Sequence, residues 1–252
     1  MDSMITHDKI KKIKEIIKVY ELFRTPGGKI ISLPSGKGGV GKTIVTLHLG
    51  AALANRGFSV AALDFNFALP NLHSYAGDMP GFTLTHYLCG LCELEKVEYV
   101  RVRVDKHQLH VYPSRSIVDL ERKVELEKLP ELLKHMKSRY DYVLIDLPPG
   151  ISKYSIYPVK LSDCVFIVTA DERASYLDAT KLSKMLETMG VTISGYIVNK
   201  YEKKMSVLKN VICEIPLDSR IKRFPDVWNK KLFKPGFLKK FIELSEKMVQ
   251  IC

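Results

Sequence analysis

The sequence lacks any apolar run long enough to cross a bilayer, and it contains no internal repeat and no low-complexity tract. The first absence excludes a helical membrane protein, and a composition of 46% apolar and 27% charged residues excludes a largely disordered chain. The first residues, MDSMITHDKIKK, contain no apolar stretch of the kind that a secretory signal carries. We therefore expect a cytoplasmic protein whose five cysteines are reduced thiols.

Acidic residues are few relative to basic ones, with 28 Asp and Glu against 39 Lys and Arg. The excess lies near the two ends, because residues 1–29 carry 7 basic and 4 acidic side chains and residues 200–252 carry 13 and 6. A basic surface attracts a polyanion, either nucleic acid, an anionic lipid surface or an acidic protein. A solubilising or heat-adapted surface has the same composition, so both interpretations stay open.

Apolar segments alternate with amphipathic ones along most of the chain, and 46% of all residues are apolar. Strands with continuous apolar sequence are typical of a parallel sheet that helices cover on both faces. We therefore predict an α/β fold built on a doubly wound, mostly parallel sheet. Strands are expected at 29–33, 59–63, 97–104, 108–112, 142–145, 164–169, 192–198 and 211–215, and helices at 42–56, 119–139, 175–189, 218–229 and 236–250.

The N-terminal residues form a separate element in this prediction. A helix is expected over 4–24, where apolar residues recur at three- and four-residue spacing between lysines. Thr25-Pro26-Gly27-Gly28 then ends the helix as a short linker. The predicted organisation is an amphipathic helix and linker over 1–28, followed by one α/β domain over 29–252.

Residues 36–43 match the phosphate-loop pattern G-x-x-x-x-G-K-[ST] between a predicted strand and a predicted helix. Glycines let successive backbone N–H groups turn toward phosphate oxygens, and the helix adds the positive end of its dipole. Lys42 then neutralises the β- and γ-phosphate oxygens, and the Thr43 hydroxyl is a ligand for Mg²⁺. The predicted phosphate-binding residues are Gly36, Lys37, Gly38, Gly39, Val40, Gly41, Lys42 and Thr43.

A second lysine, Lys37, lies inside this loop, and the segment SGKGGVGKT resembles the deviant Walker A motif of the MinD/ParA family of P-loop ATPases. The resemblance extends over roughly 29–250 and implies a SIMIBI-type P-loop fold that binds ATP and Mg²⁺. In that family the extra lysine reaches across a homodimer to the partner's nucleotide. The resemblance therefore implies that Lys37 makes dimerisation depend on ATP.

Further segments resemble the nucleotide elements of the family. Asp146, in the run DYVLIDLPPG, matches the Walker B carboxylate that holds Mg²⁺ through water. Asn199 and the residues Pro216 and Asp218 resemble adenine-recognition segments, where an amide can read both a donor and an acceptor on a base edge. Glu172 and Asp178 resemble acidic positions near the dimer face, although a solvated helix start accounts for them equally well.

The first switch segment departs from the family pattern. Asp64 matches a residue that organises Mg²⁺ through water, but Asn66 stands where the family usually has the Asp that orients or deprotonates the attacking water. An amide can hold a water but cannot take its proton. With Lys37 and Lys42, Asn66 completes our set of catalytic candidates, and we expect slow or partner-dependent ATP hydrolysis. Ile44 replaces a hydroxyl residue that touches the α-phosphate, so we expect weaker nucleotide contact there.

By this resemblance, the chain is expected to be a MinD- or FlhG-type switch. ATP would join two chains into a homodimer that binds a membrane or a regulatory protein at a division site, flagellum or archaellum, and hydrolysis would dissolve it. A peripheral position at the inner face of the cell membrane would use an apolar, lysine-flanked face on 236–252 or 1–24. The alternative for 236–252, which we favour, is a helix of the domain core.

Two other functions stay open. A ParA-like partition ATPase would bind nonspecific DNA through the basic C-terminal third. An iron–sulfur carrier would use Cys89 and Cys92, a C-x-x-C pair that could supply four ligands from two chains. No second C-x-x-C accompanies this pair, and Cys164 and Cys213 lie in apolar strand patterns typical of a core.

Overall fold

The computed structural model describes residues 7–202, 208–218 and 235–252, and within them eight strands form one sheet. The sheet confirms the predicted doubly wound α/β fold, because its order is β3-β4-β2-β5-β1-β6-β7-β8 and only the β3–β4 pair is antiparallel. The strands are β1 (Lys29–Leu33), β2 (Val60–Asp64), β3 (Val100–Val104), β4 (His107–Tyr112), β5 (Tyr142–Asp146), β6 (Cys164–Ala170), β7 (Gly195–Tyr201) and β8 (Val211–Pro216).

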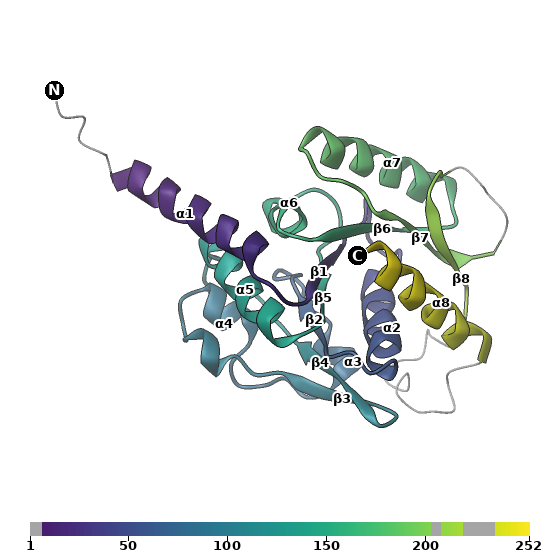
Figure 1. Ribbon diagram of the computed structural model, residues 1–252, viewed down its shortest axis with the longest axis horizontal. Coiled ribbons are helices and arrows are strands. Elements are labelled where there is room, and N and C mark those ends of the chain that lie inside the picture. The colour runs from purple at the N-terminus through teal and green to yellow at the C-terminus, as the bar shows by residue number, and fades with distance from the viewer. Residues whose placement is uncertain (1–6, 203–207, 219–234) are drawn as a thin grey trace.

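Helices cover both faces of this sheet (Figure 1). One face carries α2 and α8, whose core includes Leu47, Phe166 and Phe241, and the other carries α5, α6 and α7, with Leu132 and Leu186 in its core. The described helices are α1 (His7–Arg24), α2 (Lys42–Asn55), α3 (His73–Ala76), α4 (Leu84–Leu88), α5 (Leu129–Arg139), α6 (Lys153–Lys160), α7 (Arg173–Thr188) and α8 (Pro235–Ile251), with 3₁₀ turns η1 (Leu94–Lys96) and η2 (Leu126–Lys128).

The register of the central strands determines where polar residues meet. Asp64, at the end of β2, is paired in register with Asp146, at the end of β5. Leu33, the last residue of β1, is also paired with Asp146, and the chain then enters the phosphate loop. The two carboxylates and the loop therefore lie at one edge of the sheet, where parallel strands usually present a ligand site.

The helix expected over 119–139 is wrong in its first half, because α5 begins only at Leu129. Residues 117–121 form turns, residues 122–125 have no regular structure, and Glu121 has a left-handed backbone with φ of 49°. Among residues 119–128 only Val124 is buried, so this charged segment has no apolar stripe over successive turns that would stabilise a helix. Pro130 lies in the first turn of α5, where proline is tolerated because the N–H groups have no helical partner.

The expectation that all five cysteines are reduced thiols is wrong for two of them. Cys164 and Cys252 form a disulfide. The sequence places these residues 88 positions apart, but the end of α8 lies beside the start of β6, with 6.1 Å between their Cα atoms. In Figure 1 the chain ends next to β6. Cys89, Cys92 and Cys213 are free thiols.

Helix α8 is part of the core, as the favoured interpretation of 236–252 required. Phe241, Leu244 and Met248 are fully buried and belong to the cluster between α8, α2 and the sheet. The burial of these three residues favours the core helix over a membrane-binding face on 236–252. The helix expected at 218–229 falls mostly outside the described residues.

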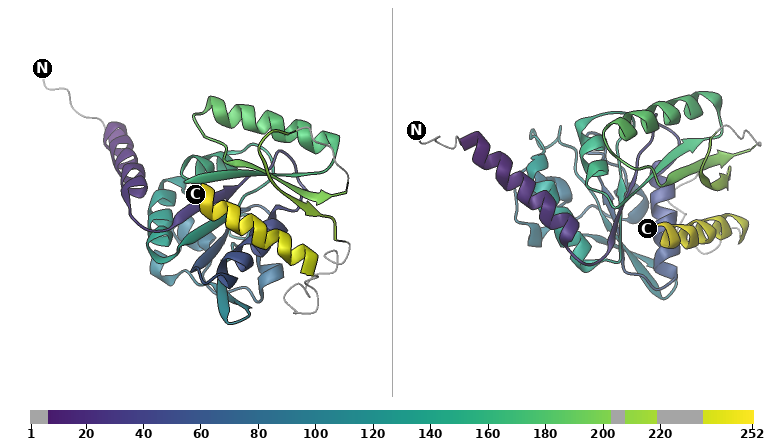
Figure 2. Two further views of the ribbon diagram at one scale, coloured as in Figure 1. Left: turned by 45° about the vertical axis from the view of Figure 1, so that its right-hand side comes forward. Right: turned by 45° about the horizontal axis from the view of Figure 1, so that its top comes forward.

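Helix α1 projects from the domain and touches it at one end (Figure 2). Leu22 is buried against α5, and the ion pairs Lys18–Glu131 and Lys134–Glu21 join the same two helices. Four other apolar side chains of α1 form an exposed stripe. They are Ile16, Ile17, Tyr20 and Phe23, each at least 49% exposed. None of the described helices is both long and apolar enough to cross a membrane.

A buried histidine joins α2 to α8 and makes stability depend on pH. His48 is 2% exposed, hydrogen-bonds the Ile44 carbonyl through Nδ1 at 2.8 Å and stacks on Phe241 at 5.0 Å between ring centroids. Burial lowers its pKa from 6.5 to about 4. The neutral form is favoured in the fold, so this stabilisation is complete above pH 6.5 and is lost as pH falls toward 4.

We expect His48→Gln to reduce the acid sensitivity of folding. Between pH 7.5 and 4.5 the wild type should lose about 2 kcal/mol of unfolding free energy through this one residue, measured by urea denaturation. His107→Gln, a change at a half-buried histidine of the β3–β4 hairpin, serves as the control. If both variants show the pH dependence of the wild type, His48 is not the cause.

Candidate functional site

The phosphate loop joins β1 to α2 at the carboxyl edge of the sheet. Gly39 and Gly41 have left-handed backbones, with φ of 79° and 88°, and a non-glycine residue would be strained at either position. Gly36 packs directly against the Asp178 backbone of α7, leaving no room for a Cβ atom. The N–H groups of residues 38–41 have no partner within the described chain. The loop therefore offers free donors to an anion.

The two lysines of the loop have different environments. Lys42 is 7% exposed, and its Nζ donates to the Ser35 hydroxyl at 2.8 Å. Burial lowers the pKa of Lys42, while the Asp146 carboxylate opposes this shift. Lys37 is one-third exposed and forms an ion pair with Glu172, the residue that precedes α7. One ammonium thus lies inside the site and the other on its outer rim.

Asp146 and Thr43 have the arrangement that a magnesium site needs. The Thr43 hydroxyl donates to Asp146 Oδ2 at 2.6 Å, while the buried Oδ1 has no hydrogen-bond partner. Burial raises the pKa of Asp146 to about 6, and the Thr43 hydrogen bond and the Lys42 charge act in the opposite direction. An unpaired buried carboxylate oxygen beside a threonine hydroxyl fits an oxygen-ligated cation and its waters.

Asp64 organises the loop that follows β2. Its carboxylate accepts the backbone N–H groups of Asn66, Asn71 and Leu72 at 3.0 to 3.1 Å. Burial, followed by the charge of Asp146, raises the pKa of Asp64 to about 7. Sequence reasoning missed Asn71, whose Oδ1 lies 3.4 Å from the Thr43 hydroxyl. Its only sequence signal is its place in the segment that follows Asp64.

The Asn66 side chain is held by the segment that follows β2. Its Nδ2 donates to the Leu69 carbonyl at 2.7 Å, which closes a short turn in the segment after β2. The side chain is half-buried. An amide cannot act as a base, and one of its two donor hydrogens is already occupied by Leu69.

The remaining predicted residues also lie at or near this edge. Asn199 Nδ2 donates to the Val40 carbonyl at 2.8 Å, so Asn199 contacts the phosphate loop directly. Pro216 ends β8 beside Tyr201 of β7, and Asp218 follows two residues later. Ile44 is half-buried in the first turn of α2 and has no hydroxyl to offer.

The C-x-x-C pair lies elsewhere, at the end of α4. Cys89 is buried and Cys92 half-buried, and burial raises the pKa of both thiols. A raised pKa opposes the thiolate form that binds metal. Among the described residues, no group of three or more His, Cys, Asp or Glu side chains is placed to hold a metal ion.

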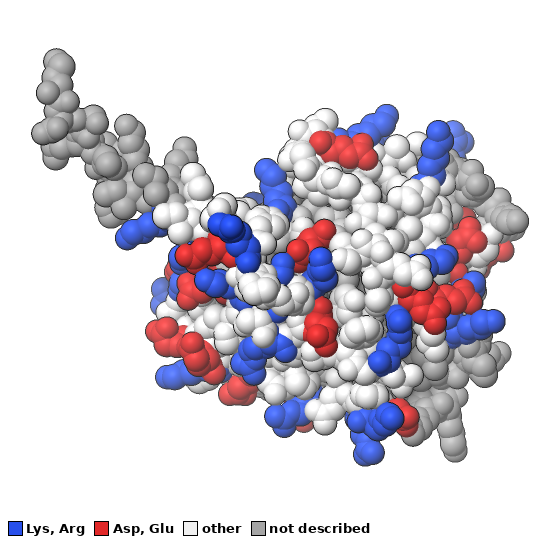
Figure 3. Space-filling model, in the orientation of Figure 1, with Lys and Arg blue, Asp and Glu red and all other residues white. Residues whose placement is uncertain are grey.

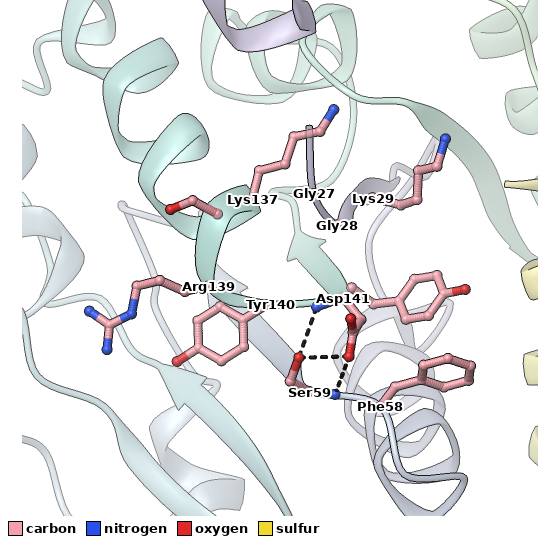
Figure 4. A pocket seen from close by; sticks show the side chains of 11 residues that line it. Gly27, Gly28, Lys29, Phe58, Ser59, Lys137, Arg139, Tyr140 and Asp141 are labelled. Carbon is pink, nitrogen blue, oxygen red and sulfur yellow. Dashed lines mark hydrogen bonds between the residues drawn. The ribbon is translucent and has the colours of Figure 1, made fainter. Parts of the chain in front are cut away.

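A separate pocket of about 380 Å³ opens at the amino edge of the sheet, where β1, β2 and β5 begin (Figure 4). Three of its polar side chains bind groups of the protein itself: Asp141 Oδ2 accepts the backbone N–H and the hydroxyl of Ser59, and Lys137 pairs with Asp163 at 2.9 Å. The three unpartnered buried polar atoms of the described chain belong to other residues. Because the pocket lies where these strands begin and the phosphate loop lies where β1 ends, the two sites are distinct.

Comparisons with known proteins agree with this geometry. The sequence profile of a ParA family, described as a NUBPL iron-transfer P-loop NTPase, matches residues 28–215. An uncharacterized ATP-binding protein of Methanocaldococcus jannaschii is 29% identical over 206 residues, which are 77% of this chain and 76% of that protein. The septum site-determining protein MinD of a Synechocystis species is 31% identical over 186 residues, covering 73% and 69%.

A solved structure has a similar fold over most of this chain. The septum site-determining protein MinD from Pyrococcus horikoshii, complexed with Mg-ADP, superposes with a TM-score of 0.74 at 28% identity. The match covers 88% of this chain and 96% of that chain.

Proposed function

Because this chain belongs to the MinD/ParA family of P-loop NTPases, we propose that it is an ATP-dependent dimerisation switch. In this proposal the ATP-bound homodimer binds a membrane or a regulatory protein and so positions a cellular machine, either a division site, a flagellum or an archaellum. The observation that carries the proposal is Lys37, a loop lysine that faces outward and pairs with Glu172 on the exposed rim. A cation in this place is available to the phosphates of a second chain.

Exposed apolar side chains near the phosphate loop support association at this face. Leu69 is 76% exposed in the segment after β2, Ile151 is 61% exposed just after Pro149-Gly150, and Leu177 is 55% exposed next to Asp178. Gly150 N–H donates to the Ser35 carbonyl, and Gly36 packs on Asp178, which ties two of these segments to the loop. Apolar groups exposed together in this way mark an interaction surface.

ATP and Mg²⁺ are the proposed cofactors. Thr43 and Asp146 would hold the cation, with Asp64 organising its surroundings, and the loop N–H groups and Lys42 would bind the phosphates. A bound Mg²⁺ would supply positive charge that neutralises the phosphate oxygens. The chain's own residues orient the phosphates and exclude water around Lys42. Asn199, through its free amide oxygen, and the 216–218 segment are proposed to contact adenine.

Hydrolysis is proposed to be slow without a partner. Asn66 can hold a water but cannot accept its proton, and its amide is bound to the Leu69 carbonyl. A long-lived ATP dimer suits a switch that a regulatory partner resets.

The direct test is the size of the chain in solution with each nucleotide. We expect a monomer with MgADP and a dimer with Mg²⁺ and a non-hydrolysable ATP analogue, measured by light scattering after gel filtration. A chain that stays monomeric at millimolar analogue would contradict the proposal, provided that calorimetry shows the analogue bound.

Helix α1 is proposed as the membrane-binding element. Its exposed stripe Ile16, Ile17, Tyr20 and Phe23 is the unpartnered apolar face that α8 does not offer. The helix has six Lys and Arg against three Asp and Glu, so its charge complements anionic lipid. On the face drawn in Figure 3, basic and acidic side chains intermingle over the α/β domain.

We expect Ile16→Ser with Phe23→Ser to reduce sedimentation with phosphatidylglycerol vesicles in the presence of ATP by at least about tenfold. Both side chains are exposed, so folding should be unaffected. Met189→Ser, at an exposed apolar residue that follows α7, is the matched control. Equal sedimentation of all three proteins would exclude α1 as the anchor, and ATP-dependent, salt-sensitive retention on DNA would favour the partition function instead.

The iron–sulfur function is the second candidate, because the matching family profile is described as an iron-transfer NTPase. Its ligands would be Cys89 and Cys92 from two chains. Protein purified without oxygen would then contain iron and acid-labile sulfide, and Cys92→Ser would remove both. The raised thiol pKa values make this the weaker candidate.

A further inference from the structure

The end of β7 has an unusual backbone beside the phosphate loop. Lys200 has a left-handed conformation, with φ of 56°, and the register between β7 and β8 is irregular from Val198 to Tyr201. Such a conformation is disfavoured for lysine and persists where the surrounding contacts hold it. Strand irregularities of this kind redirect side chains, and here they turn two successive residues toward the loop.

Those two residues bind two successive carbonyl groups of the phosphate loop. Lys200 Nζ donates to the Gly39 carbonyl at 2.6 Å, and Asn199 Nδ2 donates to the Val40 carbonyl at 2.8 Å. The fit is close, because a Cβ atom on Gly41 would collide with the Asn199 amide nitrogen.

The geometry of a peptide bond turns these contacts into an effect on the opposite side of the loop. In a planar trans peptide the C=O of one residue and the N–H of the next point in opposite directions. Holding the Gly39 carbonyl outward therefore directs the Val40 N–H inward, and holding the Val40 carbonyl does the same for the Gly41 N–H. Neither N–H has a partner within the described chain.

A third hydrogen bond fixes a peptide plane in the same way nearer the start of the phosphate loop. The Ser35 hydroxyl donates to the Lys37 carbonyl at 2.8 Å, which directs the Gly38 N–H away from Ser35. Ser35 is itself held by Lys42. Lys200 differs from Ser35 and Asn199 in being exposed, so its removal should leave the packing of the domain unchanged.

We propose that Lys200, with Asn199, is a positioning residue of the nucleotide site, which fixes two peptide planes of the phosphate loop so that their N–H groups are set to receive phosphate oxygens. Donors oriented before binding do not have to be ordered when the ligand arrives, and they bind it more tightly. The Lys200 ammonium also adds positive charge beside the loop. The inference rests on the proposed function only in requiring that this loop binds a nucleotide.

The test uses the full chain and MgADP, measured by calorimetry. Lys200→Ala should weaken MgADP binding about tenfold, the effect expected for one charge-assisted hydrogen bond. Lys200→Gly also lacks the ammonium but accepts the left-handed backbone, so it should weaken binding equally while the nucleotide-free protein melts at the same or a higher temperature. Lys200→Arg should restore most of the affinity, and Lys184→Ala, at an exposed lysine of α7, should not alter it.

A phosphorus NMR spectrum separates positioning from a general effect on folding. The β-phosphate resonance of bound MgADP should shift between wild type and Lys200→Ala and return toward its wild-type position in Lys200→Arg. Wild-type affinity in Lys200→Ala and Lys200→Gly would overturn the inference, as would a lower melting temperature of the nucleotide-free variants that accounts for their weaker binding. Failure of the wild type itself to bind MgADP would reject the proposed function and this inference together.

Discussion

Lys37→Ala is expected to remain monomeric at ATP concentrations that convert the wild type to a dimer, while its affinity for MgADP changes less than about threefold. The different environments of the two loop lysines explain why dimerisation should be lost while MgADP affinity is kept. Lys42 is buried on Ser35 and serves the chain's own phosphates, whereas Lys37 lies on the rim in an exposed ion pair with Glu172. Exposed ion pairs are weak, so Lys37 is free to exchange Glu172 for a stronger anion on a partner chain.

The measurement is light scattering with the non-hydrolysable ATP analogue, over a range of protein concentrations. We expect the dimer dissociation constant to rise at least about 100-fold, because a desolvated ammonium–phosphate contact is lost at two symmetric places. Lys153→Ala, at a lysine just beyond Ile151 near the same edge, is the matched control. A dimer of Lys37→Ala with wild-type stability would show that the lysine has no role between chains.

The second large effect concerns turnover, since Asn66→Asp is expected to raise the ATPase rate about 10- to 100-fold. An aspartate can accept a proton from the attacking water. It also cannot donate to the Leu69 carbonyl, so the side chain is released from the turn that holds the amide. The gain stays below the upper range for a general base because phosphoryl transfer has a loose transition state, in which positioning contributes much of the catalysis.

Asn66→Ala separates these two causes. It breaks the contact with Leu69 without adding a base, so it should hydrolyse ATP no faster than the wild type. If Asn66→Ala is as fast as Asn66→Asp, release of the turn is responsible and not proton transfer. If the wild type already matches Asn66→Asp, the idea that Asn66 slows hydrolysis is wrong.

The sequence was sufficient for the parts of the fold that burial dictates. The central strands β1, β2, β5 and β6 lie within one residue of their predicted bounds, because each is a short apolar run that is buried on both faces. The phosphate loop was equally predictable, since its glycines and lysines have a fixed spacing. Neither prediction needs knowledge of distant contacts.

The errors and omissions arise where distant contacts decide the outcome. Residues 119–128 have helical periodicity, but only Val124 among them is buried, and the helix begins only at Leu129. The Cys164–Cys252 disulfide depends on where α8 ends in space. The contact of Lys200 with Gly39 depends on a local irregularity of β7, which cannot be predicted from the residue pattern.

The β3 edge of the sheet affects how copies of this chain can meet. Along β3 the sequence is Val-Arg-Val-Arg-Val, and Arg101 and Arg103 are exposed while Val102 is buried. A second β3 brought alongside would place like charges next to one another, so continuous strand-by-strand growth into fibrils is disfavoured at this edge. Contacts between copies of this chain are therefore expected to use surfaces other than the β3 edge.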